Sequence, residues 1–97
     1  MTVHWWREMF EDETPVAWTM MPREAPVVAA DGTEIGKAQQ VLGDLEEDIF
    51  HGIVLKRSHD GELVELPAVH IKRMTERHVI TDLGTDDVTS LSRYRRR

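Results

Sequence analysis

The sequence predicts a small, mostly β domain in which about six short strands curl into a barrel. The first observation is a pair of Asp-Gly dipeptides, Asp31-Gly32 and Asp60-Gly61, each of which stands between short apolar runs. Asp-Gly in this setting is typical of tight β-hairpin turns, because glycine tolerates the positive φ angles that such turns require. The second observation is a length of 97 residues with no cysteine, which indicates one modest core without disulfide bonds.

The strand after the first Asp-Gly turn contains a break in its pattern. An apolar run at 27–30 precedes the turn, and the return strand is expected from about 33 to 42. Its apolar residues Ile35 and Ala38 are an odd number of positions apart, whereas side chains in a regular strand alternate between the two faces. Gly36 lies between them and is the natural place for a β-bulge, which adds one residue to the strand. Such a bulge would bend the strand, as a small barrel requires.

The remaining elements follow from shorter signals. Further strands are expected at 52–57, 63–66, 69–75 and 79–83. Pro67-Ala68 ends the fourth strand, because proline has no amide donor. An acidic loop is expected at 43–50, and a C-terminal helical turn is expected to bury Val88 and Leu91.

Two further segments flank the barrel. Residues 1–25 form a tryptophan-rich start with a proline-containing linker, residues 26–91 form the barrel, and residues 92–97 form a basic tail that is expected to be flexible. The start is expected to contain a short amphipathic helical segment. Its candidate interaction residues are Trp5, Trp6, Met9 and Phe10. Two interpretations of this cluster stay open: it completes the core of its own barrel, or it docks onto a second subunit or another protein.

The charge of the chain is unevenly distributed. The net charge is −6, and four of the 12 basic residues lie in the tail at Arg93, Arg95, Arg96 and Arg97. Residues 1–92 therefore carry 8 basic against 18 acidic residues, a net charge of −10. An acidic body repels nucleic-acid phosphates and argues against a broad nucleic-acid-binding face.

The composition excludes chemistry that needs cysteine and bears on where in the cell the protein is expected. The absence of cysteine excludes disulfides, thiolate catalysis and cysteine-based zinc sites. No apolar run approaches the ~18 residues that a membrane-spanning helix needs, and the N-terminus does not follow a signal-peptide pattern. We therefore expect no membrane span and a cytoplasmic location.

Neither the histidines nor the acidic loop forms a recognised metal motif. His51 and His59 are eight residues apart, as are His70 and His78, and this is not a known ligand spacing. The acidic loop lacks the alternation and the final glutamate of a calcium-binding EF-hand loop. The Ser-His-Asp run at 58–60 is local, whereas a catalytic triad is assembled from distant segments. The sequence predicts no catalytic residue, no metal ligand and no cofactor, so we expect that the chain is not an enzyme.

The ordered set of these signals resembles the PRC-barrel family. The string VVAADGTEIGKA at 27–38 resembles the opening hairpin of that family. Further matches follow in order: Gly52-Ile53-Val54 resembles the central strand, Leu66-Pro67-Ala68 its turn, Ile71 the residue after it, and Val79 the start of the last strand. The resemblance covers residues 26–91. The family is named for the photosynthetic reaction-centre H subunit, and a similar barrel forms part of a bacterial ribosome-maturation factor.

The resemblance implies structural roles for the matched residues. The fold-specifying residues are Asp31, Gly32, Ile35, Gly36, Gly52, Pro67, Ala68 and Ile71. Family members pack on a partner protein or on themselves and are not known for catalysis, so no catalytic residue carries over. We expect neither the membrane anchor of the reaction-centre subunit nor the second domain of the ribosome factor here, so neither of those functions carries over.

The resulting prediction is a short bacterial protein-interaction module that is non-catalytic and self-associating, as a homodimer. Two alternatives stay open. An RNA- or ribosome-associated accessory protein would use the arginines at 93–97. A small-ligand or metal-binding barrel would use His51, His70 or His78.

Overall fold

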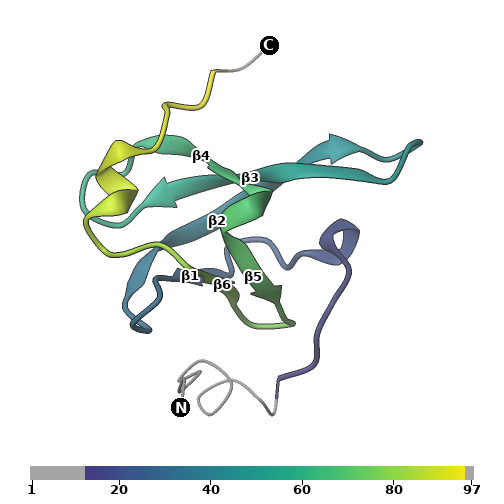
Figure 1. Ribbon diagram of the computed structural model, residues 1–97, viewed down its shortest axis with the longest axis horizontal. Coiled ribbons are helices and arrows are strands. Elements are labelled where there is room, and N and C mark those ends of the chain that lie inside the picture. The colour runs from purple at the N-terminus through teal and green to yellow at the C-terminus, as the bar shows by residue number, and fades with distance from the viewer. Residues whose placement is uncertain (1–12, 96–97) are drawn as a thin grey trace.

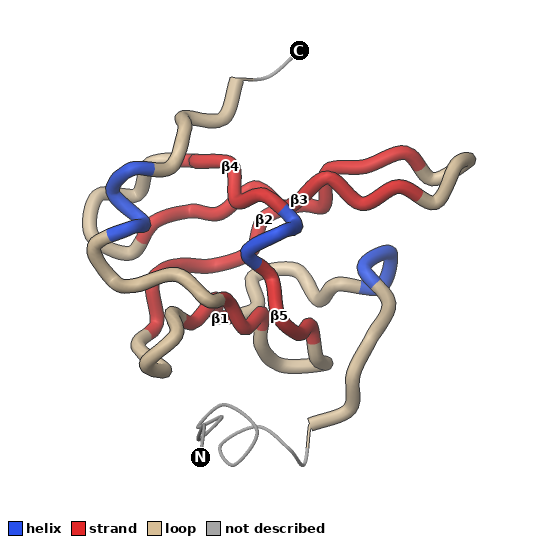
Figure 2. Tube along the Cα trace, in the orientation of Figure 1, coloured by secondary structure: helices blue, strands red, loops and turns tan. Residues whose placement is uncertain are grey.

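Six β-strands and three 3-10 turns make up the computed structural model, which describes residues 13–95 (Figure 1). The strands are β1 (Pro26–Val28), β2 (Glu34–Asp44), β3 (Ile49–Arg57), β4 (Leu63–Pro67), β5 (Ile71–Met74) and β6 (Val79–Thr81). The turns are η1 (Trp18–Met20), η2 (Ala68–His70) and η3 (Asp87–Ser90), and they lie apart from one another instead of forming a helical layer (Figure 2). The prediction of a small, mostly β fold is confirmed.

The strands form one mixed sheet that is not closed into a barrel. Its order is β4-β3-β2-β1-β6-β5, and all neighbours are antiparallel except β1 and β6, which are parallel. No ladder joins the end strands β4 and β5 in the described part of the chain, so the prediction of a closed or nearly closed barrel is not confirmed. These two strands are nevertheless joined only by η2, and three residues span about 10 Å at most. The sheet therefore curls, while Pro67, which has no amide donor, ends β4 before it can pair with β5.

The first hairpin turns at Asp31-Gly32, as predicted. The Asp31 carboxylate accepts a hydrogen bond from the Thr33 amide at 2.9 Å, and this bond lowers the pKa of the Asp31 carboxyl. Gly32 has a φ of 90°, in the left-handed region that favours glycine. The Ala29 amide donates to the Thr33 carbonyl oxygen at 2.8 Å and closes the turn.

The expected break in β2 lies one residue before Gly36. β1 pairs Val27 with Gly36 and its next residue with Glu34, which leaves Ile35 as the extra residue of a bulge. A second shift interrupts the β2–β3 ladder just after Ala38. Because of the bulge, Ile35 and Ala38 are both buried in the core, although their spacing is odd.

Gly36 and Gly52 are among the described glycines that lie where neighbouring backbone comes too close for a side chain. A Cβ on Gly52 would collide with the Leu66 carbonyl oxygen, and Gly52 also has a φ of 150°. A Cβ on Gly36 would collide with the Lys56 carbonyl oxygen and would come within 2.5 Å of the Leu55 side chain. Glycine at both positions therefore lets β2, β3 and β4 approach at their observed spacing.

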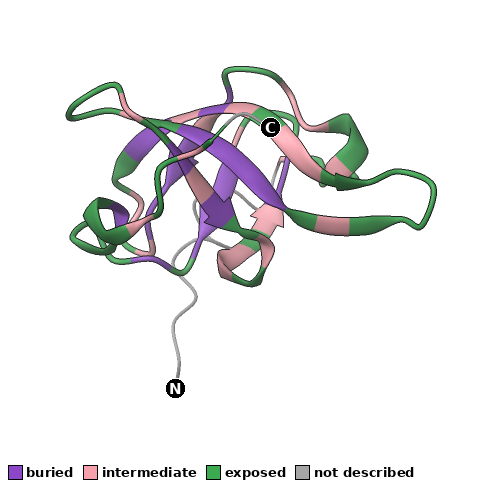
Figure 3. Cartoon of the chain, turned by 90° about the horizontal axis from the view of Figure 1, so that it is seen from above, coloured by how far each residue is buried: buried purple, intermediate pink, exposed green. Residues whose placement is uncertain are grey.

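The hydrophobic core lies on one face of the curled sheet, which we call the inner face. Figure 3 shows that buried residues are concentrated in the strands, whereas the loops are mostly exposed. Its buried residues are Ala25, Val27, Ala29, Ile35, Ala38, Ile53, Leu55, Val64, Leu66, Met74, Val79, Leu83 and Val88. Alternation along β1, β3 and β6 turns Val28, Val54 and Ile80 to the opposite, outer face, yet these three residues are buried as well. The outer face is therefore partly covered.

The helical elements expected at the two ends have different outcomes. At the C-terminal end, η3 is a single 3-10 turn that buries Val88, and the half-buried Leu91 packs against the core. The helical segment expected in the N-terminal start lies outside the described residues. The same is true of the candidate interaction residues Trp5, Trp6, Met9 and Phe10. Within the proline-containing linker, residues 18–20 form the 3-10 turn η1.

Segments near each end of the described chain pair with the two edges of the sheet. Beside β5, the Val16 amide donates to the Met74 carbonyl oxygen at 3.0 Å, and the Glu76 amide donates to the Thr14 carbonyl oxygen at 3.0 Å. Beside β4, the Glu65 amide donates to the Ser92 carbonyl oxygen, and the Tyr94 amide donates to the Leu63 carbonyl oxygen, both at 2.8 Å. Uncovered edge strands invite pairing with other chains, and these segments cover part of both edges. The first residues of the expected basic tail are therefore hydrogen-bonded to the sheet.

Candidate functional site

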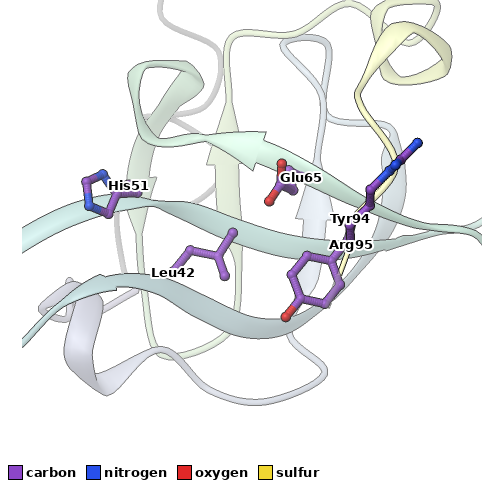
Figure 4. Close-up of a pocket in the computed structure, with 5 residues that line it drawn as sticks. All are labelled: Leu42, His51, Glu65, Tyr94 and Arg95. Atoms are coloured by element: carbon purple, nitrogen blue, oxygen red, sulfur yellow. The ribbon is translucent and has the colours of Figure 1, made fainter. Parts of the chain in front are cut away.

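A groove of about 470 Å³ lies on the outer face of the sheet (Figure 4). It is lined by Leu42 from β2, His51 from β3, Glu65 from β4, and Tyr94 and Arg95 from the C-terminal segment. The groove thus combines an aliphatic and an aromatic side chain with one carboxylate, an imidazole and a guanidinium group. Three consecutive strands and the C-terminal segment contribute to it.

The C-terminal segment forms one wall of the groove. The Tyr94 amide donates to the Leu63 carbonyl oxygen on β4 at 2.8 Å, and the Tyr94 hydroxyl accepts a hydrogen bond from Gln40 Nε2 on β2 at 3.1 Å. Because β3 lies between β4 and β2, the tyrosine ring crosses the outer face of β3. This crossing accounts for the burial of Val54, which is only 1% exposed on that face. Arg95 follows and is exposed at the groove.

A pairing irregularity places His51 at the groove. Leu42 pairs with Gly52 and the next residue of β2 pairs with Phe50, so His51 has no partner residue on β2. A bulge of this kind redirects a side chain relative to a regular strand. The exposed His51 imidazole therefore stands beside Leu42 at one end of the groove (Figure 4).

The β2–β3 hairpin projects from the body of the molecule as an arm, which we define as residues 42–52 (Figure 1). Its turn is closed by Asp44, whose Oδ1 accepts from the Glu46 amide at 3.0 Å. Asp48 has a φ of 55°, and its Oδ1 accepts from Trp18 Nε1 at 3.2 Å. Two of the four carboxylates of the expected acidic loop thus shape and hold the turn.

The turn η1 supports the inner face of the arm. The Trp18 ring stacks on the Phe50 ring, with centroids 5.4 Å apart and 16° between the planes. A Cβ on Gly43 would come within 3.1 Å of the Trp18 ring, so the glycine leaves room for the indole. Trp18 and Phe50 both pack against the core, which anchors the base of the arm to the body.

The outer face of the arm and its turn carry exposed apolar side chains. Phe50 faces the core, so its neighbour Ile49 points to the outer face, where it is 42% exposed. Leu42 points the same way and lines the groove. Leu45, in the turn, is 73% exposed. Turn residues are ordinarily polar or small, so Leu45 is an unusual residue for the end of a projecting arm.

The structure keeps the three candidate histidines apart. His70 Nδ1 is 3.1 Å from Asp82 Oδ1, and His78 Nδ1 is 2.8 Å from Glu13 Oε1, whereas His51 lines the groove. Within residues 13–95, no group of three or more potential metal ligands comes together. The described histidines therefore do not form a shared ligand set.

The N-terminal segment is held by a cluster of Glu13, Thr75 and His78. The Glu13 carboxylate accepts hydrogen bonds from Thr75 Oγ1 at 2.6 Å and from His78 Nδ1 at 2.8 Å. The buried Thr75 hydroxyl in turn accepts from the Arg77 and His78 amides at 3.2 and 3.0 Å. Burial acts to raise the pKa of the Glu13 carboxyl, but the two hydrogen bonds and the nearby positive charges of His78 and Arg77 outweigh it. The pKa of Glu13 is therefore held below its usual value of 4.5.

The Glu13→Gln variant is expected to change how stability depends on pH. Because the folded-state pKa of Glu13 lies below the unfolded value, the stabilisation from the carboxylate is fully present above pH 4.5 and is lost as the pH falls through the folded-state pKa. The difference in free energy of unfolding between the wild type and Glu13→Gln should therefore shrink on acidification. Urea unfolding at a series of pH values measures it.

A difference that stays constant across that series would contradict the role of the Glu13 carboxylate. The matched control is Glu24→Gln, which alters an exposed carboxylate in the turn before β1. This variant should stay within about 0.5 kcal/mol of the wild type at neutral pH.

The Ser-His-Asp run at 58–60 forms part of the β3–β4 turn. Asp60 accepts hydrogen bonds from Arg57 Nη2 at 2.6 Å and from the Glu62 amide at 3.0 Å. These bonds, that from Arg57 first, hold the pKa of the Asp60 carboxyl below its usual range. Arg57 also donates to the Val88 carbonyl oxygen at 3.3 Å. The aspartate thus orients an arginine that ties this turn to η3.

Sequence reasoning found part of this surface and missed the rest. It singled out His51 as a ligand candidate and Arg95 as part of the basic tail, but not Leu42 or Glu65. The sequence pattern predicts an acidic loop at 43–50, where the structure has the end of the arm. Leu45 is the sequence feature that departs from a solvent-exposed acidic loop, because a large apolar side chain among carboxylates is unusual in a turn.

Comparisons with known proteins leave the family of the chain open. No protein-family model matches the chain, and the search of curated proteins found no match. Among residues 13–95, no helix has the length and apolar character needed to cross a bilayer.

Proposed function

We propose that this chain is a non-catalytic protein-interaction module of the PRC-barrel type that associates with a second copy of itself. The curled sheet of six short strands supports the barrel type, because its two ends are brought near each other by η2. The matched glycines support it further: Gly32 occupies a positive-φ turn position, and Gly52 lies against the Leu66 carbonyl oxygen. Such residues set the path of the backbone, so the proposed interaction is assigned to exposed side chains and not to these glycines.

The exposed apolar side chains of the arm are the observation that carries the proposal. Leu45 and Ile49 lie on a rigidly anchored projection where they contribute nothing to the core of their own chain. Burial of such a side chain against a partner contributes about 1.5–3 kcal/mol. A second copy is the simplest partner, because two-fold symmetric dimers use one surface twice and are the commonest oligomers.

The polar clusters of the molecule support a non-catalytic role. The Thr75 hydroxyl accepts hydrogen bonds from two backbone amides and donates one to the Glu13 carboxylate of the N-terminal segment. Asp60 holds Arg57, which reaches the backbone of η3. These groups position backbone, whereas a hydrolytic site needs a nucleophile and a base that converge on a groove.

Sedimentation velocity over a range of protein concentrations tests the proposal. The wild type is expected to show a mass that rises from monomer to dimer with concentration. The Leu45→Ser variant should weaken the dimer at least about tenfold, because it removes an apolar contact worth about 1.4 kcal/mol or more. The matched control is Val69→Ser, which alters a side chain that is 75% exposed but lies on η2.

The outcomes separate the two candidate surfaces. A chain that is monomeric at every concentration would contradict self-association. Loss of the dimer on deletion of residues 1–12, with Leu45→Ser unchanged, would assign the contact to the cluster of Trp5, Trp6, Met9 and Phe10 and would contradict the arm.

A further inference from the structure

We infer that the tip of the arm, residues 44–49, docks into the groove of a second copy, and that the two arms exchange this contact around a two-fold axis. The inference rests on the proposed self-association and names its surface. It joins two features of the outer face: the exposed tip, and the groove lined by Leu42, Tyr94 and Arg95.

Charge complementarity selects the groove as the partner of the tip. The tip carries the exposed acidic residues Asp44, Glu46, Glu47 and Asp48. Arg95 lines the groove, and the sequence continues with two further arginines. Glu65 is the one carboxylate among the lining residues. Residues 1–92 carry a net charge of −10, of which the four tip carboxylates supply −4, so the rest of that sequence still carries −6 and does not favour an acidic partner, whereas the exposed Arg95 at the groove does.

The fold permits a reciprocal contact, because tip and groove lie at the two ends of one arm. Ile49 at the tip and Leu42 in the groove point to the same outer face. About 10 Å of strand separates Leu42 from Leu45. When two arms pack outer face to outer face in opposite directions, each tip reaches the base of the other arm. Such an isologous contact forms the same pair twice and closes as a dimer.

The antiparallel direction is also the one that the charges favour. Arms packed in the same direction would bring two acidic tips together, within the screening length of about 8 Å at physiological salt. Opposite directions separate the tips and place each beside the partner's Arg95. Leu45 and Ile49 then pack against Leu42 and Tyr94, so the centre of the contact is apolar and its rim is charged, as in stable interfaces.

Charge reversal tests the pairing directly. The variants Glu47→Arg and Arg95→Glu change exposed side chains, so both should fold. In about 50 mM salt, where screening is weak, each is expected to raise the Kd of the dimer at least about tenfold. The variant that carries both substitutions should return to within about threefold of the wild type, because the pair is reversed and not removed. Glu76→Arg, at an exposed position between β5 and β6, is the matched control and should leave the Kd unchanged.

Disulfide trapping tests the geometry. Because the chain has no cysteine, a single introduced thiol reports its own neighbour. A mixture of the Glu47→Cys and Arg95→Cys variants is expected to form a covalent heterodimer under mild oxidation, since a disulfide needs Cα atoms within about 7 Å. A mixture of Glu76→Cys and Arg95→Cys should not.

The outcomes distinguish this inference from the proposed function. If Leu45→Ser weakens the dimer but the charge reversals and the thiol pair have no effect, the groove is not the docking site and self-association through the arm still stands. If both single reversals weaken the dimer and their combination does not restore it, the direct pairing of tip and groove is overturned. If the wild type never dimerises, both proposals fail.

Discussion

Replacement of Gly52 by valine is expected to lower the free energy of unfolding by about 3 kcal/mol or more. Two effects combine at this position. The φ of 150° is one that residues with a side chain rarely adopt, and a Cβ would collide with the Leu66 carbonyl oxygen on the neighbouring strand. Because the collision is with backbone, it cannot be relieved by a side-chain rotation, and β3 and β4 must separate. Urea unfolding of the purified variant measures the loss.

Gly61→Ala is the matched control for the Gly52 prediction. Gly61 also has a positive φ, of 72°, but the nearest atom to an added Cβ is the end of the Lys56 side chain at 3.9 Å. Only the backbone strain remains, so the expected cost is about 1–2 kcal/mol. Equal losses in the two variants would show that the close approach of Gly52 to Leu66 carries no energy.

The second large effect is expected from Leu66→Ala, which should cost about 2–5 kcal/mol. Leu66 lies on β4, is fully buried and belongs to the core cluster. Its truncation removes apolar contacts and leaves a cavity that closely packed neighbours cannot fill. For a domain of this size the loss is a large part of the total stability of about 5–15 kcal/mol. Denaturant and thermal unfolding should both report it.

Leu63→Ala on the same strand serves as the control for Leu66. The Leu63 side chain is 40% exposed, so its truncation should cost less than about 1 kcal/mol. The backbone bond from Tyr94 to the Leu63 carbonyl oxygen is unaffected by this change. If Leu63→Ala destabilised the protein as much as Leu66→Ala, the inner face of β4 would not be the one that faces the core.

Local signals in the sequence predicted the hairpins well. The turns at Asp31-Gly32 and Asp60-Gly61 depend on glycine at positive φ and on an aspartate that accepts nearby amides, and both requirements are met within a few residues. The odd spacing of Ile35 and Ala38 predicted a bulge for a similar reason: only an extra residue can place both on one face. Strand ends were less accurate. β2 and β3 extend further into the acidic loop than expected, because the stacking of Trp18 on Phe50 supports the arm.

Long-range pairing decided the rest, and no local pattern encodes it. The parallel contact of β1 with β6 and the lack of a ladder between β4 and β5 in residues 13–95 depend on which strands meet, and isolated strand signals do not specify this. The candidate site shows the same limit. His51 and Arg95 belong to two separate sequence-based hypotheses, and no local pattern predicts that they line one groove.

The sequence by itself determined a small, cysteine-free, mostly β chain with two glycine turns, a bent second strand and an arginine-rich end. These properties follow from single residues and their nearest neighbours. The tertiary structure alone decided that the sheet curls without closing, that Tyr94 crosses β3 to meet Gln40, and that Ile49 of the arm and the groove lined by Leu42 and Arg95 lie on one face of the sheet. The physical reason is that a groove forms only where several segments come together, and a side chain stays exposed only where no other segment covers it. Both conditions depend on the complete set of strand pairings.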